Sequence, residues 1–514
     1  MRRAAAFAVA SLLSSAALAN WTASGRFVYE DREWNESGFS GTILTKPIRF
    51  ADVEVIDPTK SGSKQILAKG KTDADGYYAI PVVDSTTRTK VRVRVLTRSN
   101  YTSDLFVRVT NQGGSIYVGQ SADVTSHAPN VNVDWGTLTA LAFAGGEAFN
   151  LFDMGVYGAD YIKAMTGARP NSTKLVTIKW QSNGGVTVSQ TSGNTVTIRD
   201  TGGYDDTVAL HEWGHYAMTN YSKSSNPAGS HALADCHQDL RLAFDEGRAT
   251  YLGNSVVRMF DLGPANVYVR TSGASGPGGA LNFFDLESET QYSCDGSGSE
   301  VTVARSLWDI TDGPSTNDYT PGTDETLDAL ALPDVESWQT FASSVFKGAT
   351  NVTHETFWNS WFDSTVANGN LQAMKDIFGA LGIEYFPDAF ESNDTTGTAT
   401  LLYANGGLVH LTYFADTDGD GKGAADTDLF AFDAVGGAVY TAQTLNTYSD
   451  ANTNLEILDT NGSTVLASNN DRSASDHTSL VTWTAPRSDR FYIRSKHATD
   501  YGIHGSYDLS LTTP

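Results

Sequence analysis

Hydrophobic and polar residues alternate along residues 20–128 with the period of a β-strand. Val91, Val93 and Val95 lie on one face of a predicted strand, and Arg92 and Arg94 lie on the other. Turn residues, such as the Asp-Ala-Asp-Gly run at 73–76, separate the predicted strands. The pattern predicts a β-sandwich over residues 20–128.

From residue 129 to residue 384 the period becomes that of a helix. Phe149, Phe152 and Val156 share one face of a predicted amphipathic helix. Further helices are predicted from residue 207 and over residues 237–258, 300–311, 335–346 and 353–364, with strands at 175–180 and 195–199. Strands and helices around one core predict an α+β domain.

Residues 385–514 return to short strands separated by turn residues, the pattern of a second β-sandwich. The chain is therefore predicted to be multidomain, with an α+β domain flanked by two β-sandwich domains.

Residues 1–19 have the composition of an export signal. Two arginines precede an apolar run over residues 4–18, and a small-x-small triplet ends at residue 19. We expect cleavage of this signal peptide before Asn20 and a secreted or periplasmic protein. No later stretch of 18 apolar residues exists, so no membrane span is expected after the signal is removed.

The charge of the chain argues against two classes of partner. Lys and Arg number 35 against 59 Asp and Glu, which gives a formal net charge of -24. Such a field repels phosphate backbones and anionic lipid, so nucleic acid is not expected as a partner. The acids are 43 Asp and 16 Glu, a bias that favours turn-rich β structure and calcium ligands in loops.

The chain has two cysteines, Cys236 and Cys294, too few for a four-thiolate zinc site. In an oxidising compartment such a pair forms a disulfide more often than it stays reduced. We expect a disulfide bond between them.

The residues that carry chemistry are concentrated between positions 204 and 254. His211, Glu212 and His215 form an HExxH sequence. On a helix, positions i and i+4 lie one above the other, so both imidazoles can reach one metal ion while Glu212 faces the same cleft. The metzincin extension HExxHxxGxxH is excluded, because Met218 and Tyr221 occupy the places of its glycine and third histidine.

A catalytic zinc site needs a third protein ligand, and Glu246 is the first choice. It lies in the sequence LAFDEGRATYLG on a second predicted helix, where apolar neighbours make an unpaired carboxylate costly. The alternatives are His231, Asp235 and His237.

A helix-borne HExxH followed by E-G-x-A-x-Y resembles the gluzincin metallopeptidases, which include the aminopeptidase-N-type and thermolysin-like families. The resemblance implies a zincin-like fold over residues 129–384, one Zn²⁺ held by His211, His215 and Glu246, and Glu212 as general base. It implies that Thr250 is a hydrogen-bond partner of a ligand histidine. Two features depart from these families: the gap before Glu246 is longer, and no GAMEN motif is present.

Peptide hydrolysis also needs a donor for the tetrahedral oxyanion. The candidates near the motif are Tyr204, His231, Tyr251, Tyr292 and Arg305, and the sequence does not rank them. The strand predicted at 195–199 is placed either to bind an extended substrate by β-augmentation or to serve as an ordinary core strand.

Both flanking segments carry family resemblances. KPIRFADVEVID (46–57) with ILAKGKTDADGYYAIPV (66–82) resembles the transthyretin-like, carboxypeptidase-regulatory-like modules of bacterial surface enzymes, which usually do no chemistry. DTDLFAFDAVGGAVY (426–440) with LEILDTNGSTVLAS (455–468) and YGIHGSYDLSL (501–511) resembles the bacterial pre-peptidase C-terminal domain, which is found at the ends of secreted peptidases.

The last segment also contains two sets of candidate Ca²⁺ ligands. Asp416, Asp418 and Asp420 mimic the start of an EF-hand loop, but Thr427 stands where that loop has glutamate, so an EF-hand is excluded. A calcium loop of another kind and a solvated acidic turn both remain open. The family resemblance implies a second set, formed by Glu391, Asn393, Asp394, Asp426 and Asp428.

Together these features predict a secreted zinc metallopeptidase, a hydrolase that acts on protein or peptide substrates. We expect a monomeric endopeptidase with Glu212 as general base. Two alternatives stay open: a non-catalytic surface-binding protein with a vestigial zinc site, and a zinc exopeptidase.

Overall fold

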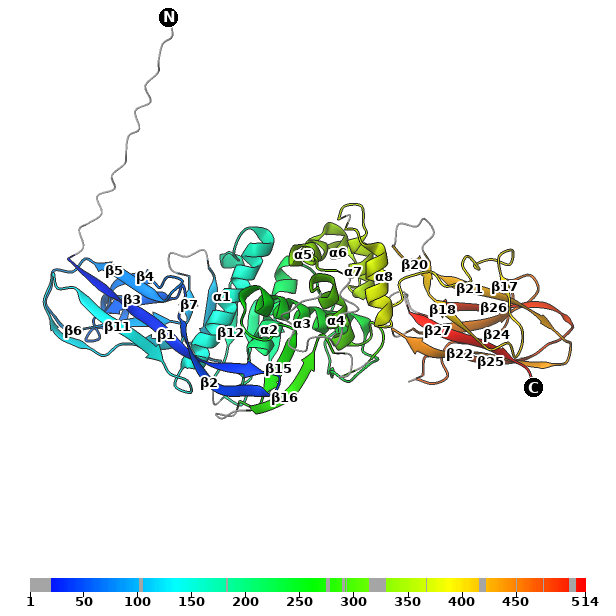
Figure 1. Ribbon diagram of the computed structural model, residues 1–514, viewed down its shortest axis with the longest axis horizontal. Helices are drawn as coiled ribbons and strands as arrows, with labels where there is room; N and C mark the ends of the chain where they lie inside the picture. Colours follow the sequence, from blue (N-terminus) through cyan, green and yellow to red (C-terminus); the bar gives the residue numbers. More distant parts are fainter. Residues whose placement is uncertain are drawn as a thin grey trace, which may run out of the picture.

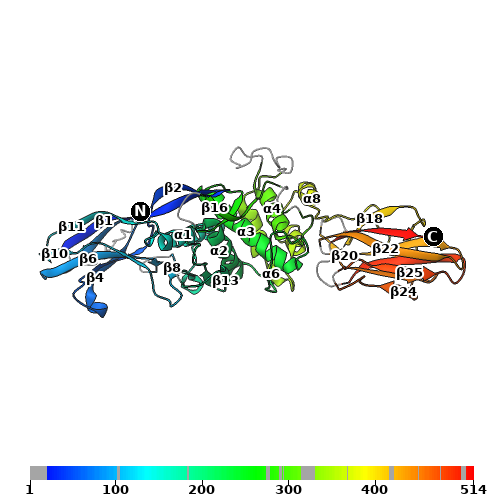
Figure 2. The same ribbon diagram turned by 90° about the horizontal axis from the view of Figure 1, so that it is seen from below.

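The computed structural model describes residues 20–100, 105–181, 184–273, 278–288, 292, 294–313, 330–366, 368–415, 422–449, 451–474, 476–498 and 505–514. Three parts lie in a row: a β-rich N-terminal part, a helical centre and a C-terminal β-sandwich (Figure 1). A view turned by 90° shows the same row (Figure 2). The predicted multidomain architecture with mixed α and β structure is confirmed. The export signal predicted over residues 1–19 lies outside the described residues.

A long hairpin of β1 (Trp21–Asn35) and β2 (Gly38–Pro47) connects the N-terminal part to the centre. Its sheet has the order β11-β1-β2-β16-β15, with β5 also paired to β1. The strands are β1 (Trp21–Asn35), β2 (Gly38–Pro47), β5 (Tyr77–Val82), β11 (Val133–Ala140), β15 (Val267–Thr271) and β16 (Gly278–Asp285).

A second sheet, in the order β10-β6-β3-β4 with β9 beside β6, completes the N-terminal part. In β6 the predicted alternation is confirmed: Val91, Val93 and Val95 are buried, whereas Arg92 and Arg94 lie on the other face in ion pairs. The strands are β3 (Asp52–Ile56), β4 (Ile66–Lys71), β6 (Arg88–Leu96), β9 (Val118–Gln120) and β10 (Val124–His127).

A third sheet crosses the boundary predicted between residues 128 and 129. Its order is β13-β14-β12-β8-β7, so β8 of the first segment pairs in parallel with β12 of the second. The strands are β7 (Arg98–Ser99), β8 (Val107–Thr110), β12 (Val176–Lys179), β13 (Gln190–Ser192) and β14 (Thr195–Thr197).

In the opposite direction, β11 follows the predicted boundary but pairs with β1. One continuous core contains residues from Trp21 to Tyr385 and also Phe414. The boundary at residue 128 therefore does not separate two sheets. Alternation in a sequence identifies a strand but not the strand it pairs with.

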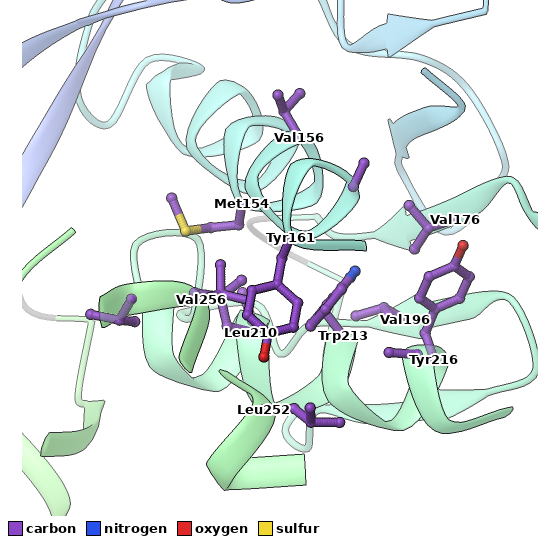
Figure 3. Packing of buried hydrophobic residues seen from close by; sticks show 14 of the residues in the cluster. Met154, Val156, Tyr161, Val176, Val196, Leu210, Trp213, Tyr216, Leu252 and Val256 are labelled. Carbon is purple, nitrogen blue, oxygen red and sulfur yellow. The ribbon is translucent and has the colours of Figure 1, made fainter. Parts of the chain in front are cut away.

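The helices of the centre pack on this third sheet. Tyr161 of the first helix meets Trp213 of the second edge to face, with ring centroids 5.9 Å apart, and Leu252 of the third lies below the two rings in Figure 3. These helices are α1 (Gly146–Thr166), α2 (Asp206–Tyr221) and α3 (Leu240–Phe260). Short 3-10 turns cover Gly62–Gln65 and Ser172–Lys174.

Five further helices belong to the described residues of the centre. The single helix predicted over 335–346 is divided at Ser343, whose backbone is extended (φ -63°, ψ 157°). The Ser343 side chain then caps the next helix by accepting a hydrogen bond from the backbone N–H of Phe346. The helices are α4 (Glu300–Thr311), α5 (Asp334–Ala342), α6 (Ser344–Gly348), α7 (His354–Trp361) and α8 (Leu371–Ala380).

The C-terminal part is a β-sandwich with a second hydrophobic core. One sheet has the order β17-β21-β26-β23-β24, the other β18-β27-β22-β25, and β19 pairs with β20. The strands are β17 (Thr400–Leu401), β18 (Leu408–Thr412), β19 (Phe414–Ala415), β20 (Ala424–Ala425), β21 (Thr427–Ala434), β22 (Val439–Tyr448), β23 (Thr453–Leu458), β24 (Val465–Asn469), β25 (Leu480–Thr484), β26 (Asp489–His497) and β27 (Ser506–Thr512).

The predicted disulfide is confirmed. Cys236 and Cys294 are bonded, which joins the loop after α2 to the segment before α4. Among the described helices, none has the length and apolar character needed to cross a bilayer.

Candidate metal centre

Helices α2 and α3 cross at the candidate metal centre, and two glycines let their backbones approach closely. A Cβ at Gly214 would lie 2.6 Å from the backbone oxygen of Ala249, and a Cβ at Gly253 would lie 2.9 Å from the backbone nitrogen of His211. Larger residues would push the helices apart. The close approach brings Glu246 of α3 against the histidines of α2.

Three side chains converge at this crossing. Nε2 of His211 lies 3.2 Å from Oε2 of Glu246, and Nε2 of His215 lies 3.1 Å from the same oxygen. The three ligand atoms all lie within 4.8 Å of one another. Two imidazole nitrogens and one carboxylate oxygen are a donor set that suits a catalytic zinc ion. The chemistry of these residues therefore fits the metal that the sequence predicts.

Hydrogen bonds on the far side of each imidazole hold these rings in place. Nδ1 of His211 lies 2.9 Å from Oγ1 of Thr250, and Nδ1 of His215 lies 3.1 Å from Oδ2 of Asp245. Both contacts leave the Nε2 atoms directed at Glu246. Asp245 was not predicted: the adjacent acids at 245–246 are visible in the sequence, but only the fold shows that both face His215.

Acidic groups make the centre favourable for positive charge. Burial lowers the pKa of His215, but the carboxylates of Glu246 and Asp245 overcome this effect and raise that pKa well above its ordinary value. Burial raises the pKa of Glu246, and the two histidines reverse this and hold it far below its ordinary value. A cation between these groups is stabilised, whether it is a proton or a metal ion.

Glu212 follows His211 on α2 and lines the same cavity, which has a volume of about 680 Å³. Its side chain is buried, and Oγ1 of Thr191 lies 2.8 Å from its Oε2. Thr191 belongs to β13, so the edge strand of the third sheet orients this carboxylate.

The strand predicted for β-augmentation is not available for it. The predicted strand at 195–199 corresponds to β14, which lies between β13 and β12, so both its edges are already paired. The open edge belongs to β13, whose residues Gln190 and Thr191 line the cavity.

His231 is the predicted oxyanion donor that the fold brings to the centre. Its Nε2 lies 3.8 Å from Oε2 of Glu246, and its Nδ1 lies 2.7 Å from Oε2 of Glu300. The hydrogen bond to Glu300 raises the pKa of His231 to about 9. The disulfide holds this arrangement, because it fixes the loop that carries His231 near the start of α4, which carries Glu300.

The other four candidate oxyanion donors do not line the cavity. Tyr204 and Arg305 donate to backbone oxygens at 2.9 and 3.1 Å, and Tyr251 and Tyr292 pack against phenylalanines. The structure therefore does not bring these four candidate donors to the cavity, because sequence proximity to the motif does not place a side chain in the cleft. The alternative third ligands Asp235 and His237 do not line the cavity either.

Tyr268 is a cavity residue that sequence reasoning missed. It lies on β15 with its ring centroid 5.9 Å from that of His211, and it stacks on Phe284 at 5.2 Å. The alternation in VYVRT (267–271) was the available signal, but no strand was predicted there.

A second cluster lies in the C-terminal sandwich. Carboxylates of Asp388, Glu391, Asp426 and Asp428 lie within 4.8 Å of one another, and Asn393 donates from Nδ2 to Oδ1 of Asp428 at 3.2 Å. One buried oxygen each of Glu391, Asn393 and Asp426 has no hydrogen-bond partner among the residues that the structure describes. An all-oxygen set of this kind suits Ca²⁺.

Among the described residues, the members of this cluster differ from the predicted calcium ligands at two positions. Asp394 is exposed and lies outside the group, whereas Asp388 belongs to it and was not predicted. Asp416, Asp418 and Asp420 lie outside the described residues.

Comparisons with known proteins find distant relatives. No protein-family model matches the chain. An uncharacterised protein of Archaeoglobus fulgidus is 26% identical in an alignment 339 residues long, which covers 59% of this chain and 90% of that protein.

Two solved structures share short segments with the chain. The pre-peptidase C-terminal domain of a collagenase from Bacillus anthracis is 15% identical, with 22% of this chain and 94% of that chain covered and a TM-score of 0.18. A periplasmic lysozyme inhibitor of Aeromonas hydrophila, PliG, is 14% identical, with 22% and 97% covered and a TM-score of 0.16. Scores this low carry no inference about function.

Proposed function

We propose that the protein is an exported zinc-dependent metallopeptidase, with residues 129–384 as a zincin-like catalytic domain of gluzincin type. The observation that carries the proposal is the convergence of His211, His215 and Glu246, with Glu212 lining the same cavity. A structural metal site needs no neighbouring base, so Glu212 favours catalysis over a vestigial site.

A bound zinc ion would supply a Lewis acid for the peptide carbonyl and would lower the pKa of water toward neutrality. The chain supplies the proton transfers. Glu212, held by Thr191 at 2.8 Å, accepts the proton of the attacking water and then gives it to the leaving amine. His231 donates from Nε2 to the developing oxyanion, while Glu300 fixes its ring and its charge.

Substrate binding is assigned to the open edge of β13. This edge strand borders the cavity beside Glu212, and its free backbone groups can pair with an extended peptide. Main-chain pairing holds a peptide independently of its ends, which suits an endopeptidase.

The charges of the cleft also favour an endopeptidase over an aminopeptidase. The four acids that line the cavity already have partners: Glu212 has Thr191, Glu300 has His231, and Asp245 and Glu246 have the histidines of α2 and Asn226. Among the described lining residues, no acid is left to bind the free ammonium group of a peptide.

The flanking parts are assigned non-catalytic roles. We assign the N-terminal sandwich to the transthyretin-like type and the C-terminal sandwich to the pre-peptidase C-terminal type, with Ca²⁺ bound by Asp388, Glu391, Asp426 and Asp428. The disulfide supports export, because such bonds persist in oxidising compartments.

Purified protein from residue 20 onward tests the proposal. We expect about one zinc ion per chain by elemental analysis, cleavage of casein, and inhibition by phenanthroline. A peptide blocked at both ends should be cut internally, whereas an exopeptidase would leave it intact. Bound zinc without turnover of any peptide would favour the surface-binding alternative.

A further inference from the structure

The far wall of the cleft is formed by one face of the β15–β16 hairpin. In β15 the side chains of Val267, Val269 and Thr271 are buried, so Tyr268 and Arg270 share the opposite face and line the cavity. Their partners across the hairpin are Phe284 and Asn282, which also line the cavity.

This wall has an aromatic end and a cationic end. Tyr268 and Phe284 lie beside His211 at the metal centre. Arg270 and Asn282 lie two residues farther along the strands, about 7 Å away at the usual rise of a β-strand. A group bound there is about one or two residues from the scissile bond of an extended peptide.

Within the described residues, Arg270 has no ion-pair partner, although the chain is rich in acids. It is half-buried, its Nε atom is buried, and that atom has no hydrogen-bond partner within the described part of the chain. No carboxylate described there lies within ion-pair distance of it. A guanidinium withdrawn from water without a counter-charge is costly, although the chain has 59 Asp and Glu from which a partner could have come.

The other arginine of the cavity shows the contrast. Arg199 lies 2.5 Å from Oδ2 of Asp205 and also bonds Oγ1 of Thr201 at 2.7 Å. Asp205 neutralises the charge of Arg199, whereas Arg270 lines the cleft with no counter-charge from a carboxylate of the described residues.

Resting on the function proposed above, we propose that Arg270, assisted by Asn282, binds a carboxylate of the peptide substrate close to the scissile bond. The guanidinium offers two parallel N–H donors that match a carboxylate, and the Asn282 amide can add a third. That carboxylate belongs either to an Asp or Glu side chain or to the C-terminus of the peptide. The site therefore selects peptides that present a carboxylate at this position.

The test compares matched peptides on the zinc-loaded protein. One series of internally quenched decapeptides carries a single Glu at successive positions, and its partner series carries Gln there. A second pair differs only in a free or an amidated C-terminus. We expect kcat/KM to be at least about tenfold higher for the carboxylate-bearing member of one pair, since a charge-assisted hydrogen bond is roughly twice as strong as a neutral one.

Variants of Arg270 then test whether this residue causes the preference for the carboxylate-bearing peptide. In Arg270→Gln the ratio of kcat/KM between the matched peptides should fall to about one. Arg270→Lys keeps the charge but lacks the two parallel N–H donors, so it should retain part of the preference. Arg270→Glu should favour Lys over Glu at the same position. Equal kcat/KM for matched peptides in the unmodified protein, or an equal loss on both peptides in Arg270→Gln, would overturn the proposal.

Binding separates this inference from the peptidase assignment. Fluorescence anisotropy with labelled forms of the same peptides, on a Glu212→Gln background, needs no turnover. Tighter binding of the carboxylate-bearing peptide, lost in Arg270→Gln, supports the Arg270 site even if the unmodified protein cleaves nothing. Cleavage without any preference rejects Arg270 and leaves the peptidase assignment intact, and absence of both binding and cleavage rejects both.

Discussion

The cluster of His211, His215 and Glu246 and the C-terminal cluster of four carboxylates can each hold a metal ion, and they differ in donor chemistry and surroundings. The central cluster has two imidazoles and one carboxylate, borders a cavity of about 680 Å³, and has Glu212 beside it. The C-terminal cluster has four carboxylates, two of them buried, and Asp428 of this cluster lies on β21 of the sandwich.

This difference indicates which metal ion each cluster suits and what that ion would do. A nitrogen-rich set with a neighbouring base and open space suits zinc chemistry, whereas a crowded oxygen set suits calcium as a structural cross-link. In the C-terminal cluster the acids mainly repel one another, and a divalent cation relieves this repulsion. The two ions should therefore be separable, with zinc controlling activity and calcium controlling local stability.

The largest expected effect is the removal of one central ligand. His215→Ala should reduce zinc from about one ion per chain to nearly none and abolish peptide cleavage. The matched change at the other cluster, Asp426→Asn, should leave both zinc content and cleavage intact. Elemental analysis and a peptide assay measure both, and loss of cleavage in Asp426→Asn would break the separation between the clusters.

Replacement of the proposed oxyanion donor should have the next largest effect. His231→Gln should lower kcat by about 10²- to 10³-fold without loss of zinc, because it removes a charged donor that acts in the transition state. His237→Gln is the control, since it alters the same loop outside the cavity. Equal effects of the two changes would argue that the loop matters only for stability.

The C-terminal cluster should make stability depend on pH. Burial and the neighbouring Asp428 and Glu391 raise the pKa of Asp426 to about 10, above an unfolded value of about 4. The folded state holds this proton more tightly, so its stabilising effect is complete below about pH 4 and is lost as the pH rises toward 10.

Calorimetry in EGTA should therefore show the C-terminal transition at a lower Tm at pH 9 than at pH 5. Calcium at about 100 times its Kd should add about 2.7 kcal/mol and oppose this decline. In Asp426→Asn, the decrease of Tm between pH 5 and pH 9 and the stabilisation by calcium should both be smaller. A Tm that rises with pH in EGTA would contradict the assignment.

The smallest effect concerns the support of His211. Thr250→Val removes the hydroxyl that lies 2.9 Å from Nδ1 of His211 and should weaken zinc binding by about tenfold. Thr250→Ser keeps the hydroxyl and should bind zinc almost as the unmodified chain does. Competition with a fluorescent chelator measures both, and equal affinities for Val and Ser would show that this contact does not orient the ligand.

Short-range patterns in the sequence predicted much of the fold. The alternation in β6, the helices α1 to α4 and the Cys236–Cys294 disulfide could all be anticipated, because each depends on local periodicity or on simple pairing. The pairing partners of the strands could not be predicted: β8 pairs with β12 in the central sheet, and β11 pairs with β1. Those pairings depend on contacts between residues far apart in the sequence.

The same distinction holds for the candidate site. HExxH at 211–215 is local, and Glu246 was inferred from the cost of burying a carboxylate. Asp245, Tyr268 and Arg270 reach the cleft only through the α2–α3 crossing and the β15–β16 hairpin, which no local pattern showed. Of the five predicted oxyanion donors, only His231 lines the cavity, since nearness in sequence was the sole guide.

The central claim is that Glu212 is a catalytic base beside a metal ion held by other residues. Peptide cleavage and zinc content measured together on Glu212→Gln test this most directly, with the exposed Glu33→Gln as control. We predict one zinc ion per chain in both variants, with kcat lower by about 10²- to 10⁴-fold only in Glu212→Gln. Normal cleavage by Glu212→Gln with zinc bound would contradict the account.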